Sequence, residues 1–334
     1  MDIVIFRFDR AELEAGLKAA VGRGILVSAL IAYANRGGEK SLRKLEMRLL
    51  AAGVTVSRTA DDLVRYHDKM LIIDRRVLYA LSFNFTHLDI DHSRGFGIVT
   101  RKPALVQEAV KLFEADVARK PYEAGIDSFV VSPVNARKQL TGLIERAKKE
   151  LLIYDPKIAD PAILRAISNR ILKGVDIKVI GAIGRKGHLL QVRPLTGMRL
   201  HTRTIIRDRR EAFVGSQSLR VAELDSRREV GIIVRESKLV GGLVKAFEAD
   251  WGRKQKKGAE ITQVAQREIK KKLKSTVKKL SPLNPLIKEA VSEVVSKVGS
   301  ETLDSHEIKQ TVEKAVKEAV RERVTEMLQE SKGD

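Results

Sequence analysis

Two stretches of the chain, YHDKMLIIDRRVLYALSFN (66–84) and LHTRTIIRDRREAFVGSQS (200–218), are versions of one pattern. Each contains a histidine, a Lys or Arg two residues later, and an aspartate seven residues after the histidine. The two histidines are 134 residues apart, and the same offset relates FEADVARK (113–120) to FEADWGRK (247–254). A constant offset over this length indicates an internal repeat.

Upstream of these stretches the offset changes to 150, as IVIFRF (3–8) and IYDPKI (153–158) show. The first repeat therefore has additional residues before its histidine, and we expect them to form a helix at 39–53 and a short strand at 54–57. The second repeat opens on FVVSP (129–133) and a helix, for which the first repeat has no counterpart. Either an upstream segment supplies that counterpart or the first repeat naturally lacks it.

The order of expected elements decides the fold class. Apolar residues recur at helical spacing in 12–21 and 163–172, whereas IVIF, MLIID and FGIVT have the composition of strands. Alternating strands and helices predict an α/β sandwich in each repeat. We assign residues 1–125 to the first repeat and 126–256 to the second.

A third segment, 257–334, has a different composition and is predicted to be a helical tail. Apolar residues step by four through 261–280, which is otherwise rich in lysine, and two prolines end this helix. The helix either lies on an anionic membrane or packs on the body of the protein. Two further helices, at about 286–298 and 303–330, are expected to pack together or to form an oligomer.

Charge and composition restrict the function. The chain has 334 residues with 63 Lys and Arg against 43 Asp and Glu, so its net charge is +20. Such a surface favours nucleic acid, an anionic membrane or phosphorylated substrates. The absence of cysteine excludes a disulfide scaffold, a thiolate metal site and a cysteine nucleophile. No secretory signal or membrane span is visible, so we expect a cytoplasmic protein, peripheral at the membrane.

The repeated pattern supplies candidate site residues in matching positions. In the first repeat they are His67, Lys69, Asp74, Ser82 and Asn84; in the second they are His201, Arg203, Asp208, Ser216 and Ser218. A histidine and a cation two residues apart on a strand share one face, because side chains alternate. Hydroxyl and amide groups nearby would complete a pocket for phosphate oxygens.

These residues resemble the paired HxKxxxxD motifs of the phospholipase D superfamily, each followed by a GSxN-type element. The resemblance covers most of residues 1–256. It implies two α/β/α halves related by a pseudo-twofold axis, with one active site at their interface. It also implies phosphodiester cleavage through a phosphohistidine, without a metal or another cofactor.

The resemblance further implies a role for each residue. His67 would attack phosphorus, and His201 would protonate the leaving oxygen and then activate water or an alcohol. The catalytic set would also include Asp74 and Asp208. The phosphate oxygens would be held by Lys69, Arg203, Ser82, Asn84, Ser216 and Ser218. Two imidazoles around one anion can divide the nucleophile and acid roles between them.

The chain departs from the family pattern at two places. Arg203 replaces the usual lysine, which keeps the charge but changes its geometry. Glu229, in SRREVGIIV (226–234), resembles the family's downstream glutamate and is expected to orient the histidine of its own repeat. The first repeat has Gly95 there, so His67 would lack a carboxylate unless Asp89 or Asp91 substitutes. The segment THLDIDH (86–92) is expected to be a polar loop rather than a metal site.

Three functions agree with these observations. The leading prediction is a phospholipid phosphodiesterase or phosphatidyltransferase, of the phospholipase D or cardiolipin synthase kind, because two repeats in one chain are typical of the lipid branch. The second is a nuclease of the same superfamily, since charge suits DNA equally well. The third is a catalytically silent scaffold that binds polyanions.

Overall fold

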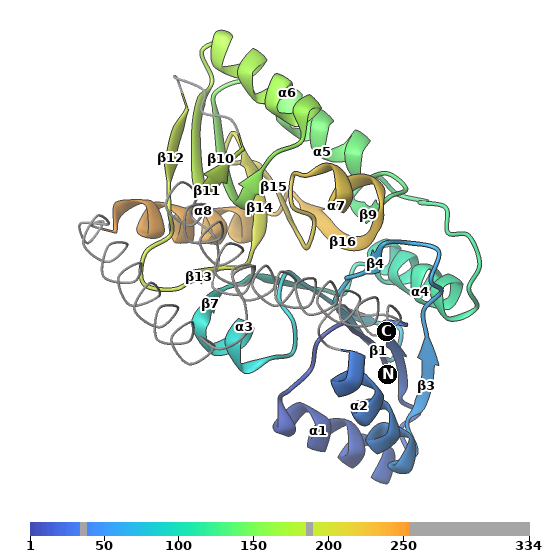
Figure 1. The fold of residues 1–334 in the computed structure, drawn as a ribbon. Helices are drawn as coiled ribbons and strands as arrows, with labels where there is room; N and C mark the ends of the chain where they lie inside the picture. The colour runs from blue at the N-terminus through green and yellow to red at the C-terminus, as the bar shows by residue number, and fades with distance from the viewer. Residues whose placement is uncertain (34–38, 185–189, 254–334) are drawn as a thin grey trace, which may run out of the picture. The chain divides into compact units, whose positions relative to one another are not determined.

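The computed structural model describes residues 1–33, 39–184 and 190–253, and the remaining segments are drawn as a grey trace (Figure 1). Met1–Arg253 forms one compact unit. The predictions made for the tail, 257–334, lie outside the described residues.

The first repeat contains a six-stranded sheet in the order β3-β2-β1-β5-β6-β8. Its strands and helices are β1 (Asp2–Ile5), α1 (Ala11–Gly22), β2 (Ser28–Ile31), α2 (Glu39–Ala51), β3 (Thr55–Arg58), β4 (Arg65–Tyr66), β5 (Met70–Ile73), β6 (Val77–Leu81), α3 (His87–His92), β7 (Ser93–Arg94), β8 (Gly97–Thr100) and α4 (Pro103–Val117). β1 runs parallel to β2 and antiparallel to β5. The sheet is therefore mixed.

The second repeat builds the same sheet, with the path β12-β11-β10-β14-β15-β16. Its elements are β9 (Phe129–Ser132), α5 (Ala136–Glu145), β10 (Glu150–Ile158), α6 (Pro161–Leu172), β11 (Asp176–Ile183), β12 (Gln191–Arg193), β13 (Arg199–Leu200), β14 (Arg203–Arg207), β15 (Glu211–Gly215), α7 (Val221–Asp225), β16 (Arg227–Val234) and α8 (Ser237–Gly252). The strand order matches the first sheet one for one, which confirms the predicted duplication of the α/β fold. β9 pairs with β16, and the first sheet has no equivalent strand among the described residues.

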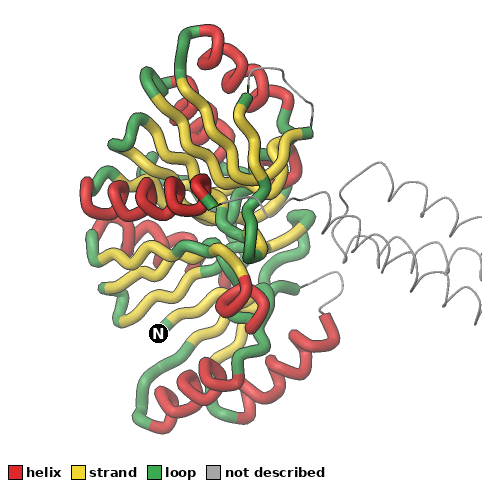
Figure 2. Tube along the Cα trace, turned by 90° about the vertical axis from the view of Figure 1, so that its left-hand side faces the viewer, coloured by secondary structure: helices red, strands yellow, loops and turns green. Residues whose placement is uncertain are grey.

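Helices and sheets form layers around three apolar clusters. α1 and α2 pack on the outer face of the first sheet, and α5 and α6 on that of the second. The inner faces of both sheets, with α4 and α8, share one continuous core (Figure 2). The spacing of apolar residues explains why α2 packs on the sheet. Three of its leucines at helical spacing, Leu42, Leu45 and Leu49, all lie on the buried side of the helix.

The segment 86–92 contains a helix rather than the predicted loop. The Thr86 hydroxyl accepts a hydrogen bond from the Asp89 N–H at 3.2 Å and caps α3. His87 and Asp91 face each other at 3.1 Å, and Arg10 donates to the same carboxylate at 2.6 Å. Among the described residues, no group of three His, Asp or Glu side chains has the arrangement of a metal site.

Candidate active site

The two repeats meet where their histidines lie. β4 pairs with β16, and β13 pairs with β7, so each repeat contributes one short strand to the other. The backbone N–H of His67 donates to the Arg228 carbonyl at 2.8 Å, and that of His201 donates to the Arg94 carbonyl at 3.1 Å. These four residues are related by the 134-residue offset. The pseudo-twofold relation therefore brings both motifs to one interface.

His67 is buried and is oriented by a carboxylate of the other repeat. Its Nδ1 lies 3.0 and 2.9 Å from the two carboxylate oxygens of Glu229. The edge of the ring meets Phe6, with ring centroids 4.5 Å apart. Because Nδ1 donates to the carboxylate, Nε2 keeps its lone pair. The expected pairing is therefore corrected: Glu229 orients His67 across the interface, not His201 in its own repeat.

His201 has a different set of partners. Its Nδ1 donates to the Ser82 carbonyl at 2.8 Å, and its Nε2 lies 3.4 Å from a carboxylate oxygen of Asp89. Gly95 occupies the place equivalent to Glu229, and a Cβ there would lie 2.7 Å from the Phe83 ring. The first repeat thus has no room for a side chain at this position unless Phe83 moves.

Asp89 is the acidic residue of the first repeat that reaches the site. It is 3% exposed. One carboxylate oxygen accepts from the Asn84 backbone N–H at 2.8 Å and from the Asn84 side-chain amide at 2.6 Å. The other accepts from Arg199 at 2.7 Å. Of the two substitutes considered from the sequence, Asp89 contacts His201 rather than His67, and Asp91 pairs with Arg10.

Two cations, the buried Lys69 and the half-buried Arg203, lie beside the imidazoles. Lys69 Nζ donates to the His67 carbonyl, and Arg203 Nη1 donates to the His201 carbonyl at 2.5 Å. Burial lowers the pKa of Lys69 to about 7, and Arg203 acts in the same direction. Burial, Lys69 and Arg203 lower the pKa of His67 well below its usual value. Burial and Arg203 also lower the pKa of His201, whereas Asp89 opposes this change.

The serines expected to bind phosphate are engaged with the protein. Ser82 Oγ accepts from the Phe96 N–H at 2.9 Å, and Ser218 Oγ donates to Asp155 at 2.8 Å. Ser216 Oγ accepts from the Val230 N–H at 3.2 Å. Burial raises the pKa of the Glu229 carboxyl, and Lys69 and a hydrogen bond from the Ser216 hydroxyl oppose this shift. Asn84, the predicted amide ligand, donates its side-chain N–H to Asp89. The same Asp89 carboxylate oxygen lies 3.4 Å from His201 Nε2, so Asn84 is beside the site.

The motif aspartates lie at the far end of their hairpins. Asp74 and Asp208 adopt φ of 52° and 51° in the turns that follow β5 and β14. Asp208 accepts backbone hydrogen bonds from Lys148, Lys149 and Glu150 and so fixes the start of β10. Seven residues of extended chain separate each aspartate from its histidine, roughly 20 Å. The prediction that these two residues belong to the catalytic set is therefore wrong, because both lie away from the imidazoles; Asp208 instead orders the backbone at the start of β10.

Other contacts at the interface were not found from the sequence. Arg94 forms a two-bond ion pair with Asp250, at 2.7 and 2.8 Å, and Arg228 pairs with Asp116 at 2.9 Å. Each pair joins one repeat to the other. The 134-residue offset relates both arginines and both aspartates, so the repeat itself was the signal. Asp155, which accepts from Ser218, and Phe6, which contacts His67, have no equivalent in the other repeat that would have singled them out in the sequence.

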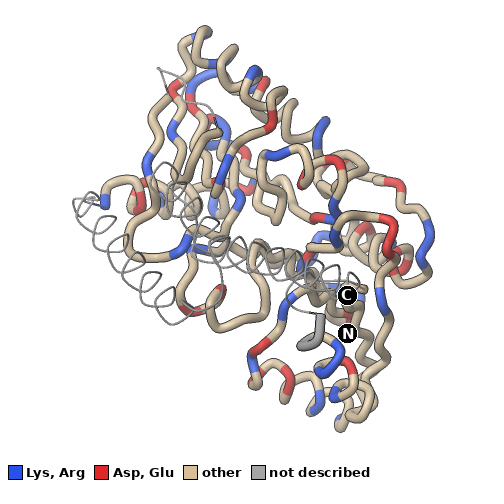
Figure 3. Tube along the Cα trace, viewed as in Figure 1, with Lys and Arg blue, Asp and Glu red and all other residues tan. Residues whose placement is uncertain are grey.

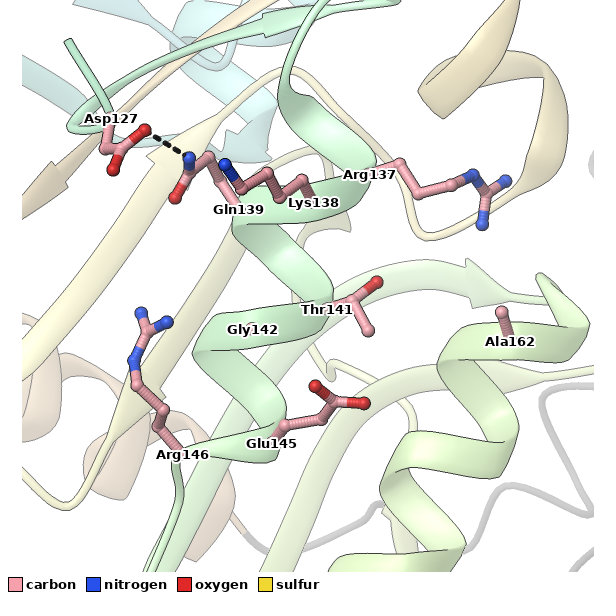
Figure 4. Close-up of a pocket in the computed structure, with 9 residues that line it drawn as sticks. All are labelled: Asp127, Arg137, Lys138, Gln139, Thr141, Gly142, Glu145, Arg146 and Ala162. Carbon is pink, nitrogen blue, oxygen red and sulfur yellow. Dashed lines mark hydrogen bonds between the residues drawn. The ribbon is translucent and has the colours of Figure 1, made fainter.

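A surface hollow of about 580 Å³ lies elsewhere, beside α5 and the start of α6 (Figure 4). Arg137 at its rim is held by Asp160 and Asp225. None of the motif residues lines this hollow. The chemistry-bearing groups are at the interface between the repeats instead.

The interface combines one imidazole whose Nε2 has no hydrogen-bond partner among the described residues, a second imidazole beside a carboxylate, and two cations, the buried Lys69 and the half-buried Arg203. A family model described as a cardiolipin synthase, PLD-like domain matches residues 1–117 and 140–251. The chain belongs to the phospholipase D superfamily. Members of this superfamily are phosphodiesterases and phosphotransferases, so phosphoryl transfer in general is supported. No curated protein sequence matches the chain.

Two solved structures show the superfamily fold. Polyphosphate kinase from Porphyromonas gingivalis is 18% identical with a TM-score of 0.62; the match covers 74% of this chain and 42% of the kinase. Phosphatidylserine synthase from Haemophilus influenzae is 11% identical with a TM-score of 0.57; the match covers 75% of this chain and 80% of the synthase. This chain therefore spans less than half of the kinase. No helix among the described residues has the length and apolarity to cross a membrane.

Proposed function

We propose that the protein is a phosphodiesterase or phosphatidyltransferase that cleaves phospholipid head groups through a phosphohistidine. The observation that carries this proposal is the difference between the partners of the two imidazoles. His67 has a carboxylate on Nδ1, whereas His201 has a carbonyl on Nδ1 and a carboxylate near Nε2. One ring is therefore suited to attack and the other to donate a proton.

In the first step, the Nε2 lone pair of His67 forms a bond to phosphorus. The bond from phosphorus to the leaving oxygen breaks, and its electron pair takes a proton from Nε2 of His201. His201 is doubly protonated in the substrate complex, because the bound phosphate anion and Asp89 raise its pKa against burial and Arg203. The Glu229 carboxylate stabilises the positive charge that develops on His67. The Ser82 carbonyl keeps the other ring proton on Nδ1 of His201, so that only Nε2 exchanges protons with the substrate.

In the second step, His201 accepts a proton from water or an alcohol, and the resulting oxygen attacks phosphorus. The bond from phosphorus to His67 breaks, and the lone pair of Nε2 is restored. Lys69, Arg203 and Asn84 are the proposed ligands of the phosphate oxygens. Ser82, Ser216 and Ser218 have protein partners, and we assign them the positioning of these ligands and of Glu229.

Two observations favour a lipid substrate. Both motifs lie in one chain, and the matching family model is described as a cardiolipin synthase domain. Lys and Arg occur along both repeats (Figure 3), and a net charge of +20 suits the anionic face of a bilayer. We propose that the protein acts peripherally at the cytoplasmic face of a membrane, with the tail as a second contact or an oligomer interface. Charge alone suits nucleic acid equally, so the test includes DNA.

The test is product formation from phosphatidylglycerol or phosphatidylcholine liposomes in the presence of EDTA and a primary alcohol. We expect phosphatidic acid or a phosphatidyl alcohol from the wild type. His67→Ala and His201→Ala each remove the nucleophile or the proton donor, and each should lower the rate by about 10³-fold or more.

His92→Ala is the matched control, because His92 is exposed and lies outside the proposed machinery. It should retain wild-type turnover. Supercoiled plasmid serves as a parallel substrate. Nicked plasmid with intact lipid would replace the proposal with a nuclease, and no turnover of either substrate would replace it with a polyanion-binding scaffold.

A further inference from the structure

Three cations surround the Phe6 ring, next to His67. The guanidinium carbons of Arg7 and Arg65 lie 5.7 and 5.4 Å from the ring centroid, and Lys69 Nζ lies 5.4 Å from it. Phe6 itself contacts the His67 imidazole. Arg7 follows β1 and Arg65 begins β4, so two elements of the first repeat contribute to the cluster (Figure 1).

Arg7 and Arg65 have no hydrogen bond or ion pair from their guanidinium groups to any described residue. Both side chains are half-buried. The contact with the ring face stabilises each cation and limits its motion, but uses none of its N–H donors. These donors therefore remain available for the planar, two-bond recognition of an anion.

The equivalent arginine of the second repeat, unlike Arg65, has a carboxylate partner. Arg199 is related to Arg65 by the 134-residue offset, and it pairs with Asp89 at 2.7 Å. The residue equivalent to Asp89 is Glu223, which is already held by Arg220 and by Arg227, the latter at 2.9 Å. Glu223, the carboxylate expected to pair with Arg65 by symmetry, therefore already has two other arginine partners.

The electrostatics of the cluster leave an excess of positive charge. Burial lowers the pKa of Arg65, and Arg227 and Arg7 lower it further, with Glu229 and Glu223 opposing. Arg65 in turn lowers the pKa of His67. Like charges held together in a partly buried place are unfavourable unless an anion joins them.

We propose that Arg7 and Arg65 form a second anion subsite beside His67, which binds a phosphate of the substrate other than the one that reacts. This inference rests on the proposed function and makes phospholipids whose head group carries two phosphates the preferred substrates within its lipid class. The reacting phosphate lies between the imidazoles, and the second lies toward β1 and β4.

The test uses two soluble head-group probes that differ by one phosphate, glycerol 1,3-bisphosphate and glycerol 3-phosphate. Binding to the full chain is measured by titration calorimetry, which does not depend on turnover. We expect the wild type to bind the bisphosphate at least about 10-fold more tightly. The double substitution Arg7→Gln, Arg65→Gln should reduce this preference to within about 2-fold.

The control is Arg101→Gln, Arg165→Gln, which removes the same charge from two exposed arginines outside the cluster. It should keep the preference. Equal affinity of the wild type for both probes, or a preference that survives Arg7→Gln, Arg65→Gln, would overturn the subsite even if lipid turnover is found. A preference with the expected pattern would support it even if turnover is absent.

A second measurement tests the lipid source of the second phosphate. Cosedimentation compares vesicles of cardiolipin, which has two phosphates, with vesicles of phosphatidylglycerol at equal total phosphate. The wild type should favour cardiolipin, and Arg7→Gln, Arg65→Gln should not. Arginine-dependent binding of a short single-stranded DNA without any vesicle preference would overturn the lipid assignment.

Discussion

His67 and His201 occupy equivalent places in two repeats, but their rings have different hydrogen-bond partners. The carboxylate of Glu229 is an acceptor with full negative charge, whereas the Ser82 carbonyl is a neutral acceptor. A charged acceptor stabilises the cation that forms when an imidazole is phosphorylated. A neutral acceptor only fixes the tautomer. Under the proposed mechanism, this asymmetry favours His67 as the nucleophile.

Glu229→Gln tests this assignment. The amide keeps the size of the side chain but removes the charge, so we expect turnover to fall by about 10²–10⁴-fold while the melting temperature changes little. The rate of lipid cleavage is the measurement. Glu236→Gln is the control, because Glu236 pairs with Lys102 away from the site. Unchanged turnover in Glu229→Gln would remove this carboxylate from the mechanism.

At the scale of elements, the interface between the repeats depends on short strands and on buried charges. β4 and β7 each contain two residues; β7 carries Arg94, and β4 pairs with the start of β16, which carries Arg228. Each arginine contacts a carboxylate of the other repeat. Asp68 lies in the same region and is 1% exposed, and neither of its carboxylate oxygens has a hydrogen-bond partner within the described part of the chain. Burial raises the pKa of Asp68 to about 6 and that of Asp116 to about 7, with Arg228 opposing both shifts.

These raised pKa values predict that stability depends on pH. The folded chain holds protons that the unfolded chain releases above about pH 4. The free energy of unfolding therefore falls as pH rises from about 4, and this fall ends above the folded pKa values of about 6 and about 7. Asp68→Asn removes one of the two groups. Between pH 5 and 8, we expect the variant to lose less stability than the wild type, by about 1 kcal/mol, because only the interval from pH 5 to the Asp68 pKa of about 6 contributes.

Urea unfolding at pH 5 and pH 8 measures this difference. Asp61→Asn is a suitable control, since Asp61 is exposed and near in sequence. Parallel pH dependence in Asp68→Asn and the wild type would show that Asp68 is already ionised at little cost.

At the scale of the whole molecule, much of the architecture was readable from the sequence. The 134-residue offset predicted two copies of one sheet, and the strand orders agree. The sequence did not predict that Glu229 of the second repeat orients His67 of the first, because this contact forms only when the two repeats pack face to face. The roles of Asp74 and Asp208 were not readable either. Their positive φ places them in hairpin turns, which the motif spacing alone does not reveal.

The packing of the two repeats also predicts the stoichiometry of the reaction. One chain supplies His67, Glu229 and His201 to a single site, so one chain should carry one covalent intermediate. In His201→Asn, a phosphatidyl ester of p-nitrophenol needs no proton donor for its leaving group, but the second step lacks its base. The intermediate should therefore accumulate.

The most direct measurement is the intact mass of His201→Asn after rapid mixing with this substrate, followed by peptide mapping. The account predicts one phosphatidyl group per chain, attached to His67. The reciprocal variant, His67→Asn, should carry none. An adduct on His201 in His67→Asn, or a burst of nitrophenolate from His201→Asn without any adduct, would contradict the account.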